Sequence, residues 1–225
     1  MTRPELVVFD CDGVLVDTER LTVVVESRVL GEMGWALSPQ EVVERWMGRS
    51  SEAQLADLEQ HLGADLALEF DRRTTAELHE TFDRELTAVE GVVELLDHLD
   101  SRGVPSCVAS SGTHGRIRRT LGITGLLPRF DGRIFSATDV QHGKPAPDLF
   151  LHAAASLGVA PSACAVIEDS VYGVQAGVAA GMTVYGFGGG LTAAERLAGA
   201  GAVTFAAMAD LRDVIAPSGP DQRLP

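Results

Sequence analysis

The chain has 225 residues, of which 45% are hydrophobic, and a formal net charge of −14. This length and composition allow a substantial buried core and exclude a disordered or fibrous protein. The acidic excess repels polyanions and acidic lipid, and the densest basic cluster, Arg116, Arg118 and Arg119, has the spacing of a solvated helix face. We therefore expect neither nucleic acid nor a membrane as a partner.

The first apolar run, residues 6–9, is short and is followed by Asp10 and Asp12. A signal peptide or a membrane span needs a longer uninterrupted apolar segment, so we expect a cytoplasmic protein. The cysteines lie far apart, in or beside apolar runs, and none has a paired or metal-ligand spacing. We expect all three to be buried thiols: Cys11, Cys107 and Cys164.

Short runs of small or branched apolar residues are typical of buried strands in a parallel sheet. Such runs lie at residues 6–9, 104–109, 163–167, 182–187 and 202–205. Between them, apolar residues recur at the three-and-four spacing of helices. The helical stretches lie at residues 91–99, 115–121, 147–157 and 171–180. This alternation predicts an α/β fold with a Rossmann-like parallel sheet.

The segment from residue 18 to residue 87 has a different pattern, with amphipathic helical stretches and no strand-like alternation. The stretches lie at residues 20–33, 39–47, 52–62 and 66–86. Because an insertion at the carboxyl end of a strand overlies the ligand-binding edge of an α/β sheet, we expect an all-helical cap. The predicted organisation is a core of residues 1–17 and 88–215, a cap of residues 18–87, and a flexible tail at 216–225, where prolines are frequent.

Acidic or hydroxyl side chains follow three of the expected strands. They are Asp10, Asp12, Ser110, Ser111, Glu168 and Asp169. Because parallel strands end at one edge of a sheet, these side chains are expected to converge in one crevice. Lys144, the only lysine of the chain, lies in a loop stiffened by two prolines and is expected to reach the same crevice.

This set of side chains has a definite chemistry. Carboxylate oxygens suit Mg²⁺, which usually rests on one or two protein carboxylates plus a substrate phosphate. Hydroxyl and backbone donors, together with one ammonium, can hold a phosphoryl group beside an acidic nucleophile. The cation and the ammonium neutralise the repulsion between that nucleophile and a phosphate dianion. The pattern predicts a Mg²⁺ cofactor and a small phosphorylated substrate.

Four segments resemble, in order and spacing, the motifs of the haloacid dehalogenase-like hydrolases. They are FDCDGVLVD at residues 9–17, Ser110 after a strand, Lys144 in GKPAPD, and IEDS at residues 167–170. The resemblance runs from about residue 6 to residue 187. It is to the branch with a helical cap inserted after the first strand, which includes sugar-phosphate phosphatases and β-phosphoglucomutases.

The resemblance implies a phosphatase that forms an aspartyl-phosphate, and it implies roles for the acidic residues. Asp10 would be the nucleophile and a metal ligand. Asp12 would be the general acid and base, and its backbone carbonyl would ligate the metal. Asp169, with Glu168 directly or through water, would complete the metal site.

The resemblance also implies how the substrate is held. Ser110, the backbone around Ser111, and Lys144 would bind the phosphoryl oxygens, and Arg49 in the cap would reach the distal part of the substrate. The alternative is a phosphosugar mutase of the β-phosphoglucomutase type, in which a cap histidine falls at or near Thr22 of this sequence. Threonine cannot titrate at neutral pH, so a phosphatase is favoured. We expect a monomer, because the cap has to open and close.

Overall fold

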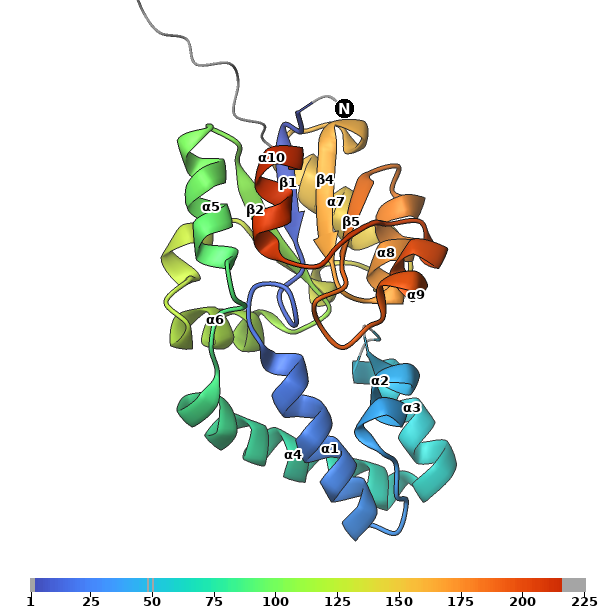
Figure 1. The fold of residues 1–225 in the computed structure, drawn as a ribbon. Helices are drawn as coiled ribbons and strands as arrows, with labels where there is room; N and C mark the ends of the chain where they lie inside the picture. The colour runs from blue at the N-terminus through green and yellow to red at the C-terminus, as the bar shows by residue number, and fades with distance from the viewer. Residues whose placement is uncertain (1–2, 48, 50, 216–225) are drawn as a thin grey trace, which may run out of the picture.

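The computed structural model describes residues 3–47, 49 and 51–215, so the flexible tail predicted at 216–225 lies outside the described residues. A six-stranded parallel sheet in the order β3-β2-β1-β4-β5-β6 forms the centre of the molecule (Figure 1). Its strands are β1 (Leu6–Phe9), β2 (Ser106–Ser110), β3 (Ile134–Ser136), β4 (Cys164–Glu168), β5 (Thr183–Phe187) and β6 (Val203–Phe205). The predicted α/β class with a Rossmann-like parallel sheet is confirmed.

Helices cover both faces of the sheet. Successive side chains of a strand point to opposite faces, and those of β1 are apolar on both, so each face has to be buried. Val7 and Phe9 of β1 pack in one core cluster with α5 (Val92–Ser101) and α6 (His114–Ile123). Leu6 and Val8 pack in the other cluster, with three helices of the opposite layer: α7 (Asp148–Ser156), α8 (Val171–Ala179) and α9 (Ala194–Ala200). The remaining short helices are η1 (Leu127–Phe130), η2 (Ala137–Asp139), η3 (Pro161–Ala163), η4 (Met208–Leu211) and α10 (Arg212–Ile215).

Four helices between β1 and α5 form the cap, which lies at the end of the sheet to which the strands point (Figure 1). They are α1 (Thr18–Glu32), α2 (Pro39–Trp46), α3 (Ser51–Leu62) and α4 (Ala64–Glu85). A capping box begins α2, where the Ser38 hydroxyl accepts from the amide of Glu41 and the Glu41 carboxylate accepts from the amide of Ser38. Trp46, Phe70 and Phe82 are buried between these helices.

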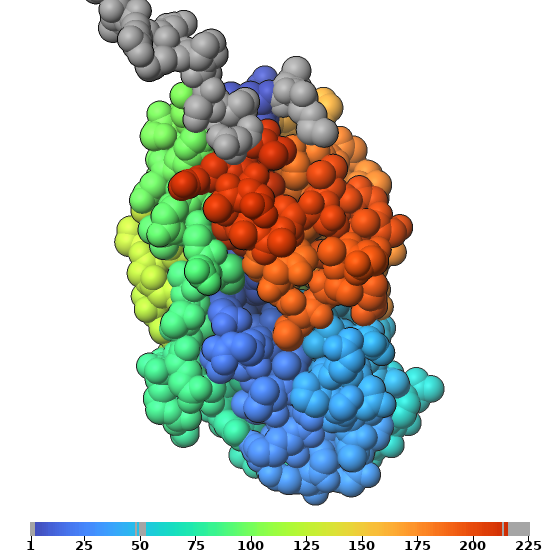
Figure 2. Space-filling view, in the orientation of Figure 1, coloured from blue at the N-terminus to red at the C-terminus, as the bar shows by residue number. Residues whose placement is uncertain are grey.

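The two segments that connect the cap to the core run side by side. The amide of Asp17 donates to the carbonyl of Thr87 at 3.0 Å, and the amide of Val89 donates to the carbonyl of Leu15 at 3.1 Å. Away from these connections the cap also touches the core, and Figure 2 shows the two packed against each other. One such contact is an ion pair of 2.7 Å between Arg119 of α6 and Asp83 of α4.

The structure differs from the sequence expectation at β3, which no pattern predicted. This edge strand has three residues and pairs only with β2, so its apolar run is too short to stand out. Cys11, Cys107 and Cys164 are buried free thiols, as expected. Within the described part of the chain, every helix is too short or too polar to cross a membrane.

Candidate active site

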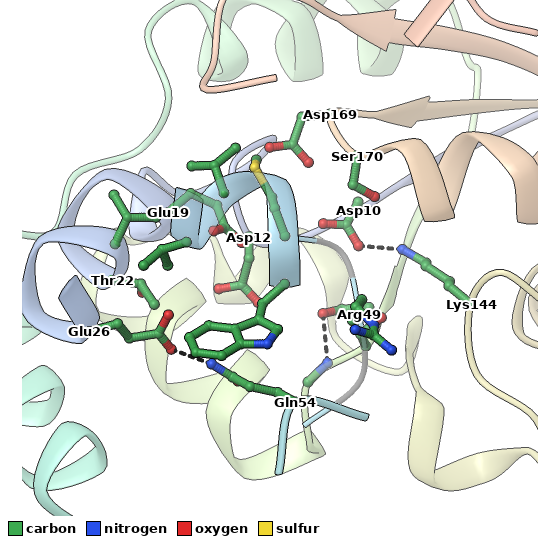
Figure 3. A pocket seen from close by; sticks show the side chains of 18 of the residues that line it. Asp10, Asp12, Glu19, Thr22, Glu26, Arg49, Gln54, Lys144, Asp169 and Ser170 are labelled. Atoms are coloured by element: carbon green, nitrogen blue, oxygen red, sulfur yellow. Dashed lines mark hydrogen bonds and ion pairs between the residues drawn. The ribbon is translucent and has the colours of Figure 1, made fainter. Parts of the chain in front are cut away.

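The carboxyl ends of β1, β2 and β4 open into a cavity of about 170 Å³ under the cap (Figure 3). Its walls combine polar groups at the strand ends with side chains of the cap helices. Every site residue predicted from the sequence lines it: Asp10, Asp12, Arg49, Ser110, Ser111, Lys144, Glu168 and Asp169. The structure therefore brings together side chains that are up to 159 residues apart in the chain.

Lys144 is the buried cation of the site. Its Nζ lies 2.5 Å from Oδ1 of Asp10 and 2.6 Å from Oε1 of Glu168, and it donates to the carbonyl of Ala109 at 3.2 Å. Only 1% of its side chain is exposed. Burial opposes the charge, but the carboxylates of Asp10 and Glu168 outweigh it and raise the pKa of Lys144. All three ammonium donors are therefore used inside the site.

Asp10 is a carboxylate held among other carboxylates. Burial raises its pKa, the ammonium of Lys144 lowers it, and the charges of Glu168 and Asp12 raise it; the net result is a pKa of about 7. Asp10 thus needs positive charge beside it to remain ionised. Lys144 supplies part of that charge.

Glu168 is fixed by protein donors at both of its oxygens. Oε1 accepts from Lys144, and Oε2 accepts from the amide and the hydroxyl of Ser170, each at 2.9 Å. The Ser170 hydroxyl also accepts from the amide of Gly173 at 3.0 Å, which caps the start of α8. A Cβ at Gly173 would lie 1.7 Å from Oε1 of Glu168, so only glycine leaves room for this carboxylate. Glu168 therefore positions Lys144.

Asp169 has the features of a metal ligand. Its Oδ2 is buried and has no hydrogen-bond partner among the described residues. Burial raises the pKa of Asp169 well above its usual range, and the charges of Glu168 and Glu19 act in the same direction. A Cβ at Gly13 would lie 2.0 Å from Oδ2, so only glycine at this position leaves room for the Asp169 carboxylate. A cation beside Oδ2 would satisfy both the oxygen and the charge.

The donor set fits Mg²⁺. Within the described residues, no group of three or more His, Cys, Asp or Glu side chains has an arrangement that could hold a metal ion. Mg²⁺ does not need such a group, because it usually rests on one or two carboxylates and completes its shell with water and substrate phosphate. Asp10 and Asp169, on neighbouring strand ends, are two such carboxylates.

Asp12 is held away from Lys144 by two other donors. Its Oδ1 accepts from the hydroxyl of Thr18 at 2.7 Å and from Nη2 of Arg116 at 3.2 Å. The negative charge of Asp12 raises the pKa of Arg116. The interpretation of the basic cluster around Arg116 as a solvated helix face was therefore wrong for this residue, which points into the site. Arg119 of the same cluster is paired with Asp83 of the cap.

The end of β2 supplies hydroxyl and amide groups. Ser110 is 1% exposed, and its hydroxyl accepts from the amide of Gly112 at 3.1 Å. Ser111 follows it and is half-buried in the cavity wall. The helix α6 begins just beyond, where the hydroxyl of Thr113 accepts from the amide of Arg116. A helix start beside hydroxyl groups is a favourable place for an anion.

Arg49 reaches the cavity from the cap. Its guanidinium lies 5.9 Å from the ring centre of Tyr172, and Nη1 donates to the carbonyl of Arg45 at 3.5 Å. It forms no ion pair with any carboxylate of the described residues, whereas Lys144 and Arg116 both do.

The inner face of α1 carries two acidic residues that sequence reasoning missed, Glu19 and Glu26, on either side of Thr22. Glu19, Thr22 and Glu26 line the cavity at successive turns of the helix, and Glu26 accepts from Nε2 of Gln54 at 2.8 Å. Burial raises the pKa of Glu19 to about 8 and that of Glu26 to about 7. Their three-and-four spacing was a readable signal, because polar residues on the inward side of a cap helix have no packing role.

The fold and the site define an α/β protein with a buried lysine between carboxylates at the strand ends of its parallel sheet. The sequence model described as haloacid dehalogenase-like hydrolase matches residues 7–187. The chain belongs to this family.

Similar proteins carry phosphatase names. The chain is 36% identical over 188 residues to 6-phosphogluconate phosphatase of Escherichia coli, covering 83% of this chain and 84% of that protein. It is 36% identical over 178 residues to Hexitol phosphatase A of the same organism, with 78% and 79% covered. A haloacid dehalogenase-like protein from Agrobacterium tumefaciens superposes with a TM-score of 0.81 at 39% identity, covering 94% of this chain and 97% of that one. The chain is a phosphoric monoester hydrolase.

Proposed function

We propose that the protein is a Mg²⁺-dependent phosphatase that hydrolyses a sugar phosphate through an aspartyl-phosphate on Asp10. The observation that carries the proposal is the buried contact of Lys144 with Asp10 at 2.5 Å, beside the unpartnered oxygen of Asp169. An acidic nucleophile is paired there with the charges that let it approach a phosphate dianion. The names of the two Escherichia coli relatives support a sugar phosphate as the substrate.

The metal site would consist of the Asp10 carboxylate, the backbone carbonyl of Asp12 and the Asp169 carboxylate. Glu168 would act through water, because both of its oxygens already accept hydrogen bonds from protein groups. When bound, Mg²⁺ would neutralise charge on the phosphoryl oxygens.

In the first half-reaction, an Asp10 oxygen attacks phosphorus and the bond from phosphorus to the ester oxygen breaks. Asp12 gives its proton to the departing alkoxide, so an alcohol leaves and Asp10 carries the phosphoryl group. The contact of Asp12 with Arg116 keeps this carboxyl group within the cavity.

In the second half-reaction, Asp12 takes a proton from water, and the water oxygen attacks phosphorus. The bond between Asp10 and phosphorus breaks, which returns the free carboxylate and releases inorganic phosphate. The Ser110 hydroxyl, the backbone around Ser111, and the Lys144 ammonium would hold the phosphoryl oxygens through both steps. Arg49 would contact the distal part of the substrate.

The second candidate function is transfer of the phosphoryl group to another sugar phosphate, as in a mutase. Thr22 lines the cavity, but its hydroxyl has no titration near neutral pH with which to serve an accepting sugar. Water is therefore the proposed acceptor.

The test is to incubate the protein with a panel of phosphorylated sugars and Mg²⁺, and to measure both free phosphate and isomerised product. We expect free phosphate only, its loss on chelation of the metal, and its loss in Asp10→Asn. The matched control is Asp131→Asn, which makes the same change at an exposed loop residue and should keep full activity. If the protein isomerised the sugar phosphate and needed a bisphosphate to do so, it would be a mutase and not a phosphatase. If Asp10→Asn still released phosphate, Asp10 would not be the nucleophile.

A further inference from the structure

Glu26 is the only charged residue of the described cap that is buried, with 8% of its surface exposed. It has no ion-pair partner among the described residues, and the amide of Gln54, at 2.8 Å, is the side-chain donor that it meets. Burying a carboxylate without a cation is costly, so such a residue is retained where something else needs it.

The surroundings of Glu26 have unsatisfied hydrogen-bonding capacity. The hydroxyl of Thr22, one turn earlier on α1, is buried and has no hydrogen-bond partner in the part of the chain that the structure describes. Glu19, a further turn away, lines the same cavity. In Figure 3, Glu26, Thr22 and Glu19 lie on the opposite side of the view from Lys144. A substrate whose phosphate lay at Lys144 would therefore meet these groups with its other end.

Glu26 lies at the border of two cavities. Thr22, Glu26 and Gln54 also line a second cavity, of about 450 Å³, in the interior of the cap next to α6. A leaving group larger than a few atoms can therefore extend from the phosphate end as far as Glu26.

We propose that Glu26 and Gln54 select the leaving group of the substrate. Glu26 would accept hydrogen bonds from the hydroxyls of a neutral polyol, and Gln54 would donate one to them. A leaving group with a second anionic charge would be repelled by Glu26. The inference rests on the proposed phosphatase function and names its substrate class. A polyol offers donors to the carboxylate of Glu26 and an acceptor to the amide of Gln54. A second carboxylate or phosphate at this place would lie beside Glu26 and Glu19, where the nearby Arg116 is engaged by Asp12. Arg49, which has no ion pair among the described residues, lies against Tyr172 and on the Lys144 side of Figure 3.

The direct test uses two phosphate esters that differ at one end only. Sorbitol 6-phosphate ends in a hydroxymethyl group, and 6-phosphogluconate has the same open six-carbon chain but ends in a carboxylate. At pH 8 with Mg²⁺, we expect kcat/KM for phosphate release to be at least about tenfold higher for sorbitol 6-phosphate, because like charges at close range cost about that much affinity. Equal values, or a preference for 6-phosphogluconate, would overturn the proposal.

Two variants with opposite expected effects locate the selectivity. Glu26→Gln removes the charge at constant shape and should reduce the preference about tenfold, mainly through faster turnover of 6-phosphogluconate. Gln54→Glu adds a second carboxylate at the same place and should increase the preference. Glu44→Gln is the matched control, because Glu44 is exposed on α2, and it should leave the ratio unchanged. A ratio that does not move in either cavity variant would contradict the role of Glu26, and circular dichroism verifies that each variant is folded.

A binding measurement separates this inference from the proposed function. Calorimetry with the Asp10→Asn protein measures the affinity for both esters without turnover, alone and combined with Glu26→Gln. One informative outcome is that Asp10→Asn binds sorbitol 6-phosphate more tightly than 6-phosphogluconate, the double variant binds both equally, and the wild type releases no phosphate. That result would refute the phosphatase function and support the selectivity. Equal binding of the two esters, or no binding of either, would refute the selectivity.

Discussion

Gly13 has a φ of 79°, in the left-handed region that favours glycine, and it faces Oδ2 of Asp169. We expect Gly13→Ala to lower the free energy of unfolding by about 2 kcal/mol or more, from backbone strain together with overpacking. It should also weaken Mg²⁺ binding, because the new methyl group would displace the Asp169 carboxylate.

The matched control is Gly34→Ala. Gly34 has a similar φ of 88° but has open space where a Cβ would lie, so it isolates the cost of strain. Chemical denaturation measures stability, and calorimetry measures metal affinity. Equal effects of the two substitutions on both quantities would show that Gly13 has no steric role beside Asp169.

Glu26 makes the stability of the protein dependent on pH. Burial raises its pKa from 4.5 in the unfolded chain to about 7 in the folded protein, so the folded state binds a proton more tightly. That stabilisation is complete below pH 4.5 and is lost as the pH rises through about 7. Its size is about 3 to 4 kcal/mol, at about 1.4 kcal/mol per pH unit.

Glu26→Gln removes this dependence. We expect the variant to be more stable than the wild type at pH 8, with an advantage that shrinks toward pH 5. Chemical denaturation of both proteins at several pH values measures the difference in their free energies of unfolding. This difference isolates the contribution of Glu26, because all other titratable groups are present in both proteins. An advantage that is constant with pH would show that Glu26 keeps an ordinary pKa.

At the residue scale, the convergence of the polar side chains at the strand ends was predictable and the contacts with the cap were not. Asp10, Ser110 and Asp169 follow strands, and parallel strands must end at one edge, so the sequence pattern indicates their convergence. The contact of Arg116 with Asp12 depends on the rotation of α6 about its axis, which the spacing of basic residues does not determine.

At the scale of elements, α8 connects stability with the site. Its first turn is capped by the hydroxyl of Ser170, which also donates to Glu168, the partner of Lys144. Ser170→Ala should lower the free energy of unfolding by about 1 kcal/mol and should also slow phosphate release, because Glu168 loses a donor.

Ser38→Ala is the comparison for Ser170→Ala. Ser38 caps α2 in the same manner but lies outside the cavity, so its loss should cost similar stability and leave phosphate release unchanged. Thermal denaturation and a phosphate assay of both variants test this. Unchanged phosphate release in Ser170→Ala would mean that the backbone amide alone holds Glu168.

Elements with a clear period were predictable to within a few residues. The cap helix expected at residues 39–47 is α2 (Pro39–Trp46), because Ser38 and Pro39 mark its start. By contrast, β3 was missed, because a three-residue edge strand has too few side chains to show an alternation. The long-range pairing with β2, rather than its own sequence, defines it.

At the scale of the whole molecule, the net charge of −14 opposes the approach of a phosphorylated substrate. Salt screens this repulsion, since the Debye length falls from about 30 Å at 0.01 M to about 10 Å at 0.1 M. We expect kcat/KM to rise by about twofold over this range, while kcat at saturating substrate stays constant. A fall in kcat/KM with salt would show that the local positive groups of the site dominate the long-range field.

The hydrogen bond between Asp17 and Thr87 places the entry and the exit of the insertion next to each other. Removing everything between these two residues would leave ends that a single peptide bond or a short turn could rejoin, without disturbing the order of the sheet. With the roles proposed above, selectivity would be encoded in the insertion and bond cleavage in the segments that flank it. Replacing this insertion with the helical segment of another family member would then change which phosphate ester is hydrolysed and leave the residues at the strand ends unchanged.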